Sequence, residues 1–314
     1  MNQIAVIRGA IATLPTPYRF GSLDMPAFEK LCERLIKRGI SALVVCSTTG
    51  EASLLAPGEH HRLIYAAASV AARRVPVVAG AGSNNTEKAV ELARSAELAG
   101  ASALLCVTPY FLKPTEAGMM AHFRAVHDAV RIPVILHDVP ERTACSLTDV
   151  AITRLASLPR IAGLKDAAAN VERVGRLRRR LGPNFLLLSG ADSEQPLFRA
   201  AGGDGCVSIA ANVTPALCSA LQRACDEKRT AEVERIDRLL APLHEALSLE
   251  INPIPLKRAL HRLGLVQDGL RLPLTPLRPE ADRRLGAVLD RIMPIEEEMS
   301  RLASESLRNR PRAA

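Results

Sequence analysis

The chain has no tryptophan, and only 3% of its 314 residues are aromatic. Since 48% of the residues are hydrophobic, its core must be built from aliphatic side chains. No apolar run approaches the roughly 20 residues needed to cross a bilayer. The first residues also lack the basic head and long apolar segment of a secretory signal. We therefore expect a protein that does not act in or through a membrane.

Cysteines occur seven times, but never as a Cys-x-x-Cys pair. Several lie within apolar runs, such as Cys46 in LVVCS and Cys106 in ALLCVT. An odd number at irregular spacing favours reduced, buried thiols of a cytoplasmic protein over a disulfide framework. No His and Cys cluster has the spacing of a zinc site. His60 and His61 are adjacent and would point in different directions from a helix, so we expect no metal site.

The formal net charge is +8, which by itself would fit nucleic acid or an anionic membrane. However, much of the excess comes from the run Arg178, Arg179 and Arg180 and from the polar C-terminal residues. No aromatic residues are interleaved with these cations, and no nucleic-acid motif is present. We interpret the charge as solvated helix faces and a tail, and expect no nucleic-acid partner. The positive charge still favours anionic substrates.

Short apolar runs alternate with longer amphipathic runs along most of the chain. Continuous apolar runs are typical of parallel strands buried on both faces. Eight strands are expected, at 5–13, 42–47, 75–82, 103–108, 133–138, 161–166, 185–190 and 205–210. The intervening helices are expected to begin after capping residues, namely Asp24, Thr86, Thr115, Ser146 and Asn170.

The repeat of strand and helix predicts a parallel α/β fold. Eight regular units, about 30 residues apart, favour a closed (β/α)8 TIM barrel over an open sheet, and the glycine signature of a dinucleotide site after the first strand is missing. We expect the barrel over residues 1–226 and a C-terminal helical extension, packed on it, over 227–302. The polar residues 303–314 are expected to be disordered.

Active sites of such barrels lie at the C-terminal ends of the strands. The sixth expected strand ends in Lys165, which follows the apolar run IAGL. Burying a charged amine is costly, so burial lowers the pKa of a lysine and frees the amine as a nucleophile. Such an amine attacks a ketone to form an iminium ion, which withdraws electrons from the neighbouring carbon. The alternative is a structural lysine paired with Asp166 or another acid.

Seven segments, STTGE, VTPYFLKP, HDVPERTA, GLKDA, LLSGAD, GCVSIAANV and EINPIPLK, occur in this order between about residues 5 and 275. Together they resemble the dihydrodipicolinate synthase and N-acetylneuraminate lyase family. The resemblance implies a TIM barrel with an extra helical region, usually assembled as a homotetramer, that requires no metal and no organic cofactor. It also implies that a 2-oxo acid, usually pyruvate, forms a Schiff base with Lys165.

The resemblance also implies roles for further residues. Thr48 matches the hydroxyl of a proton relay, and Thr49 matches a binder of the pyruvate carboxylate. Arg142 matches the arginine that fixes the carboxylate of the incoming aldehyde, for which a guanidinium fork is well suited. Val207 matches a residue whose backbone carbonyl lies near the bound keto acid. Gly190 is expected at the same end of the barrel.

The sequence departs from the family pattern at three positions. His137 stands where the family has a tyrosine that protonates and orients the substrate, and Phe111 replaces a second tyrosine that reaches across the dimer interface. Ser47 replaces the first residue of a Gly-Thr-Thr-Gly-Glu motif. His137 can still act in acid–base chemistry, since imidazole titrates near neutrality; alternatively, it only fills the place of the tyrosine and hydrogen-bonds Thr48. Phe111 cannot pass a proton, and we expect it to pack at a subunit interface.

These residues predict a lyase that condenses pyruvate with an aldehyde. Arg142 and Thr48 favour aspartate semialdehyde as the aldehyde, and hence a step of lysine biosynthesis. One alternative is a catabolic aldolase or dehydratase of the same family that acts on a sugar-derived or hydroxylated 2-oxo acid. Another is a paralogue that binds keto acids without catalysis.

Many synthases of this family are inhibited by lysine, which the resemblance places beside the counterparts of Ala52, His60, Asn84 and Tyr110. An acidic residue there receives the ammonium of the ligand, and the matching residue here is Lys88. We therefore expect no lysine inhibition, although the neighbouring Glu87 could bring a carboxylate into place.

Overall fold

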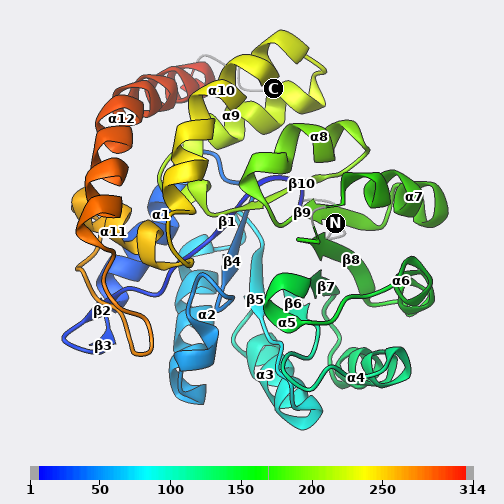
Figure 1. Cartoon of the computed structure of the whole chain (residues 1–314). Coiled ribbons are helices and arrows are strands. Elements are labelled where there is room, and N and C mark those ends of the chain that lie inside the picture. Colours follow the sequence, from blue (N-terminus) through cyan, green and yellow to red (C-terminus); the bar gives the residue numbers. More distant parts are fainter. Residues whose placement is uncertain (1–6, 169, 309–314) are drawn as a thin grey trace.

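The computed structural model describes residues 7–168 and 170–308. Eight parallel strands form a closed barrel (Figure 1) in the order β1-β10-β9-β8-β7-β6-β5-β4. Their bounds are β1 Gly9–Thr13, β4 Ala42–Val45, β5 Val77–Gly80, β6 Ala103–Val107, β7 Val134–Asp138, β8 Ile161–Asp166, β9 Leu186–Ser189 and β10 Gly205–Ser208. The predicted TIM barrel is thus confirmed, and each of the eight barrel strands lies inside a predicted one. Residues 5 and 6 of the first prediction lie outside the described residues.

The helices surround the barrel. Those of the barrel units are α1 Met25–Lys37, α2 Pro57–Ala71, α3 Thr86–Leu98, α4 Glu116–Ala129, α5 Pro140–Thr143, α6 Asp149–Ala156, α7 Val171–Leu181, α8 Gln195–Ala200 and α9 Pro215–Asp226. Short 3-10 turns lie at Ala52–Leu54, Asp192–Glu194 and Ala210–Asn212. A small hairpin, β2 Tyr18–Arg19 and β3 Ser22–Leu23, follows β1 and was not predicted.

Three further helices, α10 Thr230–Leu247, α11 Ile254–Arg262 and α12 Pro279–Arg308, pack together along one side of the barrel against α9 (Figure 1). They form the helical extension expected from residue 227. Helix α12 continues to Arg308, beyond the start of the expected tail at 303, and residues 309–314 lie outside the described residues. In the described ranges, no helix is both long and apolar enough to span a membrane.

Two hydrophobic clusters follow from the alternation of side chains along each strand. The smaller cluster fills the barrel interior and includes Ile11, Ile135, Leu188 and Val207. The larger cluster lies between the strands and the surrounding helices. All seven cysteines are free thiols, five of them buried. Both clusters are dominated by aliphatic side chains, as the scarcity of aromatic residues predicts.

The helix caps agree with the sequence in part. The side chains of Asp24, Thr115 and Asn170 accept hydrogen bonds from the first turns of α1, α4 and α7, as predicted. Two predictions were wrong: Asn85, not Thr86, caps α3, and Thr148, not Ser146, caps α6. All four are residue types suited to capping, so that the sequence alone does not distinguish them. The Ser146 hydroxyl instead donates to Asp138 at 2.8 Å.

Candidate active site

Lys165 lies near the end of β8, at the level of His137 on β7 and Leu188 on β9. Leu188 belongs to the cluster inside the barrel, so that Lys165 occupies an inward position and is only 8% exposed. The register between β7 and β8 shifts by one residue between Val134 and Ile135. Because side-chain direction alternates along a strand, this shift sets which residues of β7 and β8 meet inside the barrel.

The alternative that Lys165 pairs with Asp166 does not hold. Asp166 is the next residue on the strand and therefore points away from the barrel interior. Outside the barrel, its carboxylate lies 3.5 Å from the guanidinium of Arg173. Among the described residues, Lys165 makes no ion pair or side-chain hydrogen bond. Its amine is therefore buried without a neutralising partner.

Burial is the main reason that the pKa of Lys165 falls to about 8, and the positive charge of Arg142 lowers it further. Asp192 and Cys206 have the opposite effect and raise the pKa of Lys165. The carboxylate of Asp192 is itself satisfied, because it accepts hydrogen bonds from the Ser208 hydroxyl and from the Ile209 and Ala210 backbone N–H groups. With a pKa of about 8, about a tenth of the Lys165 amine is neutral at pH 7, compared with fewer than about one in a thousand for an ordinary lysine.

His137 is 4% exposed and occupies the inward position next to Lys165. Burial, with the positive charges of Lys165 and Arg142, holds the pKa of His137 well below its ordinary value. The imidazole is therefore neutral near pH 7, rather than partly protonated as expected from its ordinary pKa. No hydrogen bond joins its ring to Thr48 or to any other described residue, although both side chains line one cavity.

The loop after β4 carries Thr48 and Thr49, and contacts from distant parts of the chain fix it. The Ser47 hydroxyl lies 2.7 Å from the Thr13 hydroxyl at the end of β1. Asn252, in the segment between α10 and α11, donates from Nδ2 to the Thr49 hydroxyl at 3.0 Å. Thr49 is 3% exposed, whereas Thr48 is less buried and reaches the cavity.

A buried ion pair anchors the same loop to the helical extension. Glu51, which has a left-handed backbone with φ of 55°, accepts a hydrogen bond at 2.5 Å from Lys257 on α11. The Lys257 ammonium and the Arg271 guanidinium each lie 4.3 Å from the ring centre of Tyr18. The roles of Asn252 and Lys257 were not predicted, although both residues lie in EINPIPLK, one of the motifs of the family resemblance.

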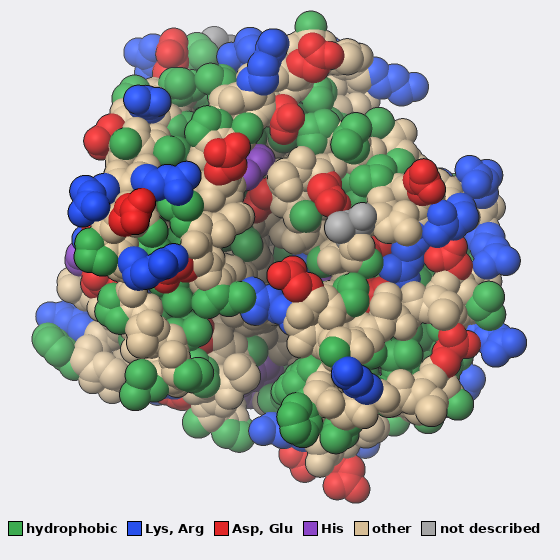
Figure 2. All heavy atoms as spheres, in the orientation of Figure 1, with side chains coloured by type: hydrophobic (Ala, Val, Ile, Leu, Met, Phe, Trp, Pro, Cys, Tyr) green, Lys and Arg blue, Asp and Glu red, His purple; other side chains and the backbone are tan. Residues whose placement is uncertain are grey.

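Two cavities meet at the mouth of the barrel, where Figure 2 shows a hollowed surface bordered by acidic and basic side chains. The first, of about 330 Å³, is lined by Thr48, His137, Arg142 and Tyr110 among others. The second, of about 760 Å³, lies between the barrel and the helical extension and is lined by Arg142, Gly190 and several carboxylates. Arg142 thus stands between the two cavities, and burial lowers the pKa of its guanidinium.

Gly190 and Val207 complete the surroundings of Lys165. A Cβ atom on Gly190 would lie 2.7 Å from the Ala167 side chain and 3.2 Å from Cε of Lys165. Only glycine therefore leaves the lysine side chain free on that side. Val207 pairs with Ile11 and packs in the barrel interior at 2% exposure. The structure thus gathers all seven predicted site residues at one end of the barrel.

No group of three or more His, Cys, Asp or Glu side chains among the described residues is arranged to hold a metal ion. His60 and His61 diverge, with Nε2 of His60 at 2.7 Å from the Gly80 carbonyl and Nδ1 of His61 at 3.2 Å from the Ser95 hydroxyl. The chemistry available at the mouth is that of an amine nucleophile, an imidazole, hydroxyl groups and a guanidinium. This set suits the capture of a keto acid as an imine.

Comparison with known proteins supports this interpretation. Residues 6–292 match the model of the dihydrodipicolinate synthetase family. The chain is 46% identical over 287 residues to a 4-hydroxy-tetrahydrodipicolinate synthase of Parvibaculum lavamentivorans, covering 90% of this chain and 98% of the relative. It also resembles the crystal structure of dihydrodipicolinate synthase from Aquifex aeolicus, with a TM-score of 0.89, 38% identity and coverage of 90% of this chain and 97% of the other.

A third relative is the enzyme from Cyanidioschyzon merolae, whose crystal structure has lysine bound. It matches with a TM-score of 0.87 and 35% identity, over 90% of this chain and 97% of that one. Sequence, fold and the placement of Lys165 agree, and the chain belongs to the dihydrodipicolinate synthetase family.

Proposed function

We propose that this protein acts as a 4-hydroxy-tetrahydrodipicolinate synthase, which condenses pyruvate with aspartate semialdehyde through an imine on Lys165. The observation that carries the proposal is the buried, unpaired Lys165 amine, whose pKa is about 8, at the mouth of the barrel beside His137 and Arg142. The reaction would supply a precursor of lysine.

The chemistry starts with attack of the neutral Lys165 amine on the ketone carbon of pyruvate. Loss of water gives the imine, and removal of a proton from the methyl carbon converts it into an enamine. The enamine carbon attacks the aldehyde carbon, forming the new carbon–carbon bond while the aldehyde oxygen takes up a proton. The amino group of the former aldehyde substrate then attacks the imine carbon, closing the ring and releasing Lys165 as the free amine.

The binding roles of Thr49 and Val207 rest on the family resemblance, and that of Arg142 rests on the cavities as well. Thr49 binds the pyruvate carboxylate, and the Val207 carbonyl lies near the keto acid. Arg142 pairs with the carboxylate of the aldehyde, for which its position between the two cavities is well suited.

The larger cavity favours an amino aldehyde over a sugar-derived acid. Besides Arg142, carboxylates line it, including Glu141, Asp237 and Glu245. Negative charge there attracts the ammonium group of aspartate semialdehyde. A sugar-derived 2-oxo acid has no such group, and a non-catalytic binding protein would have no need of a buried, unpaired amine.

His137 and Thr48 are the candidates for proton transfer at the imine. Because the imidazole is neutral near pH 7, it offers one nitrogen that accepts a proton or a hydrogen bond. The Thr48 hydroxyl faces the same cavity and can relay a proton between the substrate and His137.

We further propose a homo-oligomer in the cytoplasm. Phe111 and Leu112, in the loop after β6, are 85% and 65% exposed. Covering these apolar side chains with a second subunit would remove them from water. The seven free thiols are consistent with a reducing compartment.

A panel of aldehydes assayed with pyruvate tests the function. Aspartate semialdehyde should give the highest kcat/KM, and removing its ammonium, as in succinate semialdehyde, should reduce this value by about tenfold or more. A sugar-derived aldehyde that is preferred over aspartate semialdehyde would instead identify the catabolic alternative.

The rate of imine formation should depend on pH through Lys165. Only the neutral amine attacks, so kcat/KM for pyruvate should rise with pH and level off above about 8. Replacing Arg142 with Met should move the midpoint upward, because the cation at this position lowers the pKa of Lys165. A pH profile of kcat/KM from 6 to about 10, recorded for the wild type and for the variant, measures both midpoints. A wild-type midpoint near the pKa of an ordinary lysine would show that burial does not lower the pKa of Lys165.

Replacing His137 with Phe should reduce turnover by about 100-fold, because the imidazole is lost as a proton acceptor. Borohydride trapping of the pyruvate imine should persist, since Lys165 remains. The variant His137→Tyr, which restores the residue typical of the family, is the matched control and should retain more activity. Unchanged turnover of His137→Phe would mean that the histidine only fills space.

Lysine should not inhibit this protein. Lys88 lines the smaller cavity together with Ala52, His60 and Tyr110, three of the positions that the resemblance relates to lysine binding. A cation about 4 Å from the ligand ammonium would cost about 4 kcal/mol at an effective dielectric of about 20, as much as the whole free energy of millimolar binding, about 4 kcal/mol.

The test is to measure the activity of the wild type and of Lys88→Glu at increasing lysine concentrations, or to measure lysine binding to each by calorimetry. We expect no inhibition of the wild type at about 1 mM lysine, and inhibition of the variant. Saturable inhibition of the wild type would show that Glu87 or another acid replaces the missing contact.

A further inference from the structure

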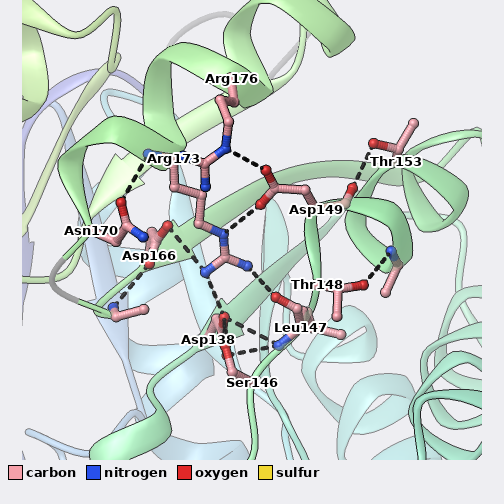
Figure 3. Close-up of polar contacts among 12 residues, drawn as sticks. Asp138, Ser146, Leu147, Thr148, Asp149, Thr153, Asp166, Asn170, Arg173 and Arg176 are labelled. Carbon is pink, nitrogen blue, oxygen red and sulfur yellow. Dashed lines mark hydrogen bonds and ion pairs between the residues drawn. The ribbon is translucent and has the colours of Figure 1, made fainter.

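A buried arginine on α7 connects the ends of the two strands that carry Lys165 and His137. Arg173 is 4% exposed, and its guanidinium contacts three carboxylates (Figure 3). It lies 2.8 Å from Asp138, 3.5 Å from Asp166 and 3.3 Å from Asp149. It also donates to the Leu147 carbonyl.

Two of these carboxylates belong to residues that come directly after His137 and Lys165 in the sequence. Asp138 follows His137 on β7, and Asp166 follows Lys165 on β8. The register pairs His137 with Lys165 and Asp138 with Asp166. Since neighbouring residues of a strand point to opposite sides, holding both aspartates outside the barrel keeps Lys165 and His137 inside it and side by side.

The same cluster fixes the segment that carries Arg142. Asp138 is fully buried and accepts hydrogen bonds from the Ser146 hydroxyl at 2.8 Å and from the Leu147 N–H at 3.3 Å. The backbone leaves β7 at Asp138, passes through Arg142 and returns to the same carboxylate at Leu147. Arg173 closes this loop from the other side through the Leu147 carbonyl.

Without Arg173, Asp138 and Asp166 would face each other at paired positions with no cation between them. Buried like charges repel strongly. Already in the intact cluster, burial and the neighbouring Asp138 raise the pKa of Asp166, whereas Arg173 lowers it. The repulsion would be relieved by protonation of one carboxylate, or by movement of the strand ends and thus of Lys165 and His137.

We propose that Arg173 is a positioning residue, which holds Lys165, His137 and Arg142 in their reactive arrangement through Asp138 and Asp166. This inference rests on the proposed function in taking Lys165 as the imine-forming amine. Arg173 is not among the residues that line the cavities at the mouth. It acts on them through Asp138, Asp166 and the Leu147 carbonyl.

The test compares Arg173→Met with Arg176→Met. Arg176 lies on the same helix and forms an exposed ion pair with Asp149 at 2.9 Å, without contacting Asp138 or Asp166. The readout is the rate at which pyruvate becomes trapped on the protein by borohydride, measured well below the melting temperature of each variant. Arg173→Met should be slower by about tenfold or more, since small misplacements of reacting groups have effects of this size. Arg176→Met should stay within about twofold of the wild type.

A conservative variant separates positioning from stability. Arg173→Lys keeps the charge but loses the planar fork, so its trapping rate should lie between those of the wild type and of Arg173→Met. It also provides the comparison if Arg173→Met fails to fold. Lower melting temperatures with trapping rates equal to the wild type in every folded variant would mean that the cluster is only structural, and would overturn the proposal.

A second readout does not need pyruvate. Competitive acetylation with acetic anhydride reports the pH at which Lys165 becomes nucleophilic. Arg173→Met and Arg173→Lys should move this midpoint away from that of the wild type, and Arg176→Met should not. If the wild type formed no imine with pyruvate, the proposed function would fail, whereas unchanged acetylation profiles would overturn the role of Arg173.

Discussion

A lysine amine of ordinary pKa is almost fully protonated near neutral pH, and burial away from water and carboxylates makes it reactive. Much of the structure follows from meeting this constraint at Lys165. The barrel supplies the burial: Lys165 lies above an interior filled by aliphatic side chains and is only 8% exposed. Its neighbour on β7 is an uncharged imidazole rather than an acid. The pKa of Lys165 therefore falls to about 8 without any special chemistry of the lysine itself.

Carboxylates are nevertheless close, and the fold directs each of them elsewhere. Asp166 is the next residue in the chain but points outward to Arg173, and Asp192 is occupied by a hydroxyl and two backbone N–H groups. Glu51, in the loop that carries Thr48 and Thr49, is paired with Lys257. Asp166 and Glu51 are thus paired with cations other than Lys165, and the oxygens of Asp192 are occupied by neutral donors, so that none of the three forms an ion pair with Lys165.

The parts of this arrangement that are local could be predicted from the sequence. The apolar runs located all eight strands, and the position of Lys165 at the end of such a run indicated a nucleophilic amine. The caps of α3 and α6 were displaced by one and two residues, because neighbouring Ser, Thr and Asn residues are similarly able to cap. Tertiary contacts decided between them, as when Asp138 takes the Ser146 hydroxyl.

The contacts that fix the site are long-range, which is why the sequence did not reveal them. Asn252 meets Thr49, and Lys257 meets Glu51, across about 200 positions of the chain. The register shift between β7 and β8 leaves no mark in the composition of either strand. The low pKa of His137 likewise depends on its burial beside two cations, and not on its place in a motif.

Mass spectrometry of the wild-type protein after incubation with pyruvate and borohydride determines whether Lys165 is the amine that forms the imine. Peptide mapping should find one carboxyethyl group per chain, attached to the Nζ atom of Lys165. The other buried lysine, Lys257, is held by Glu51 and should remain unmodified. A carboxyethyl group on Lys257 or another lysine, or no adduct at all, would contradict the account.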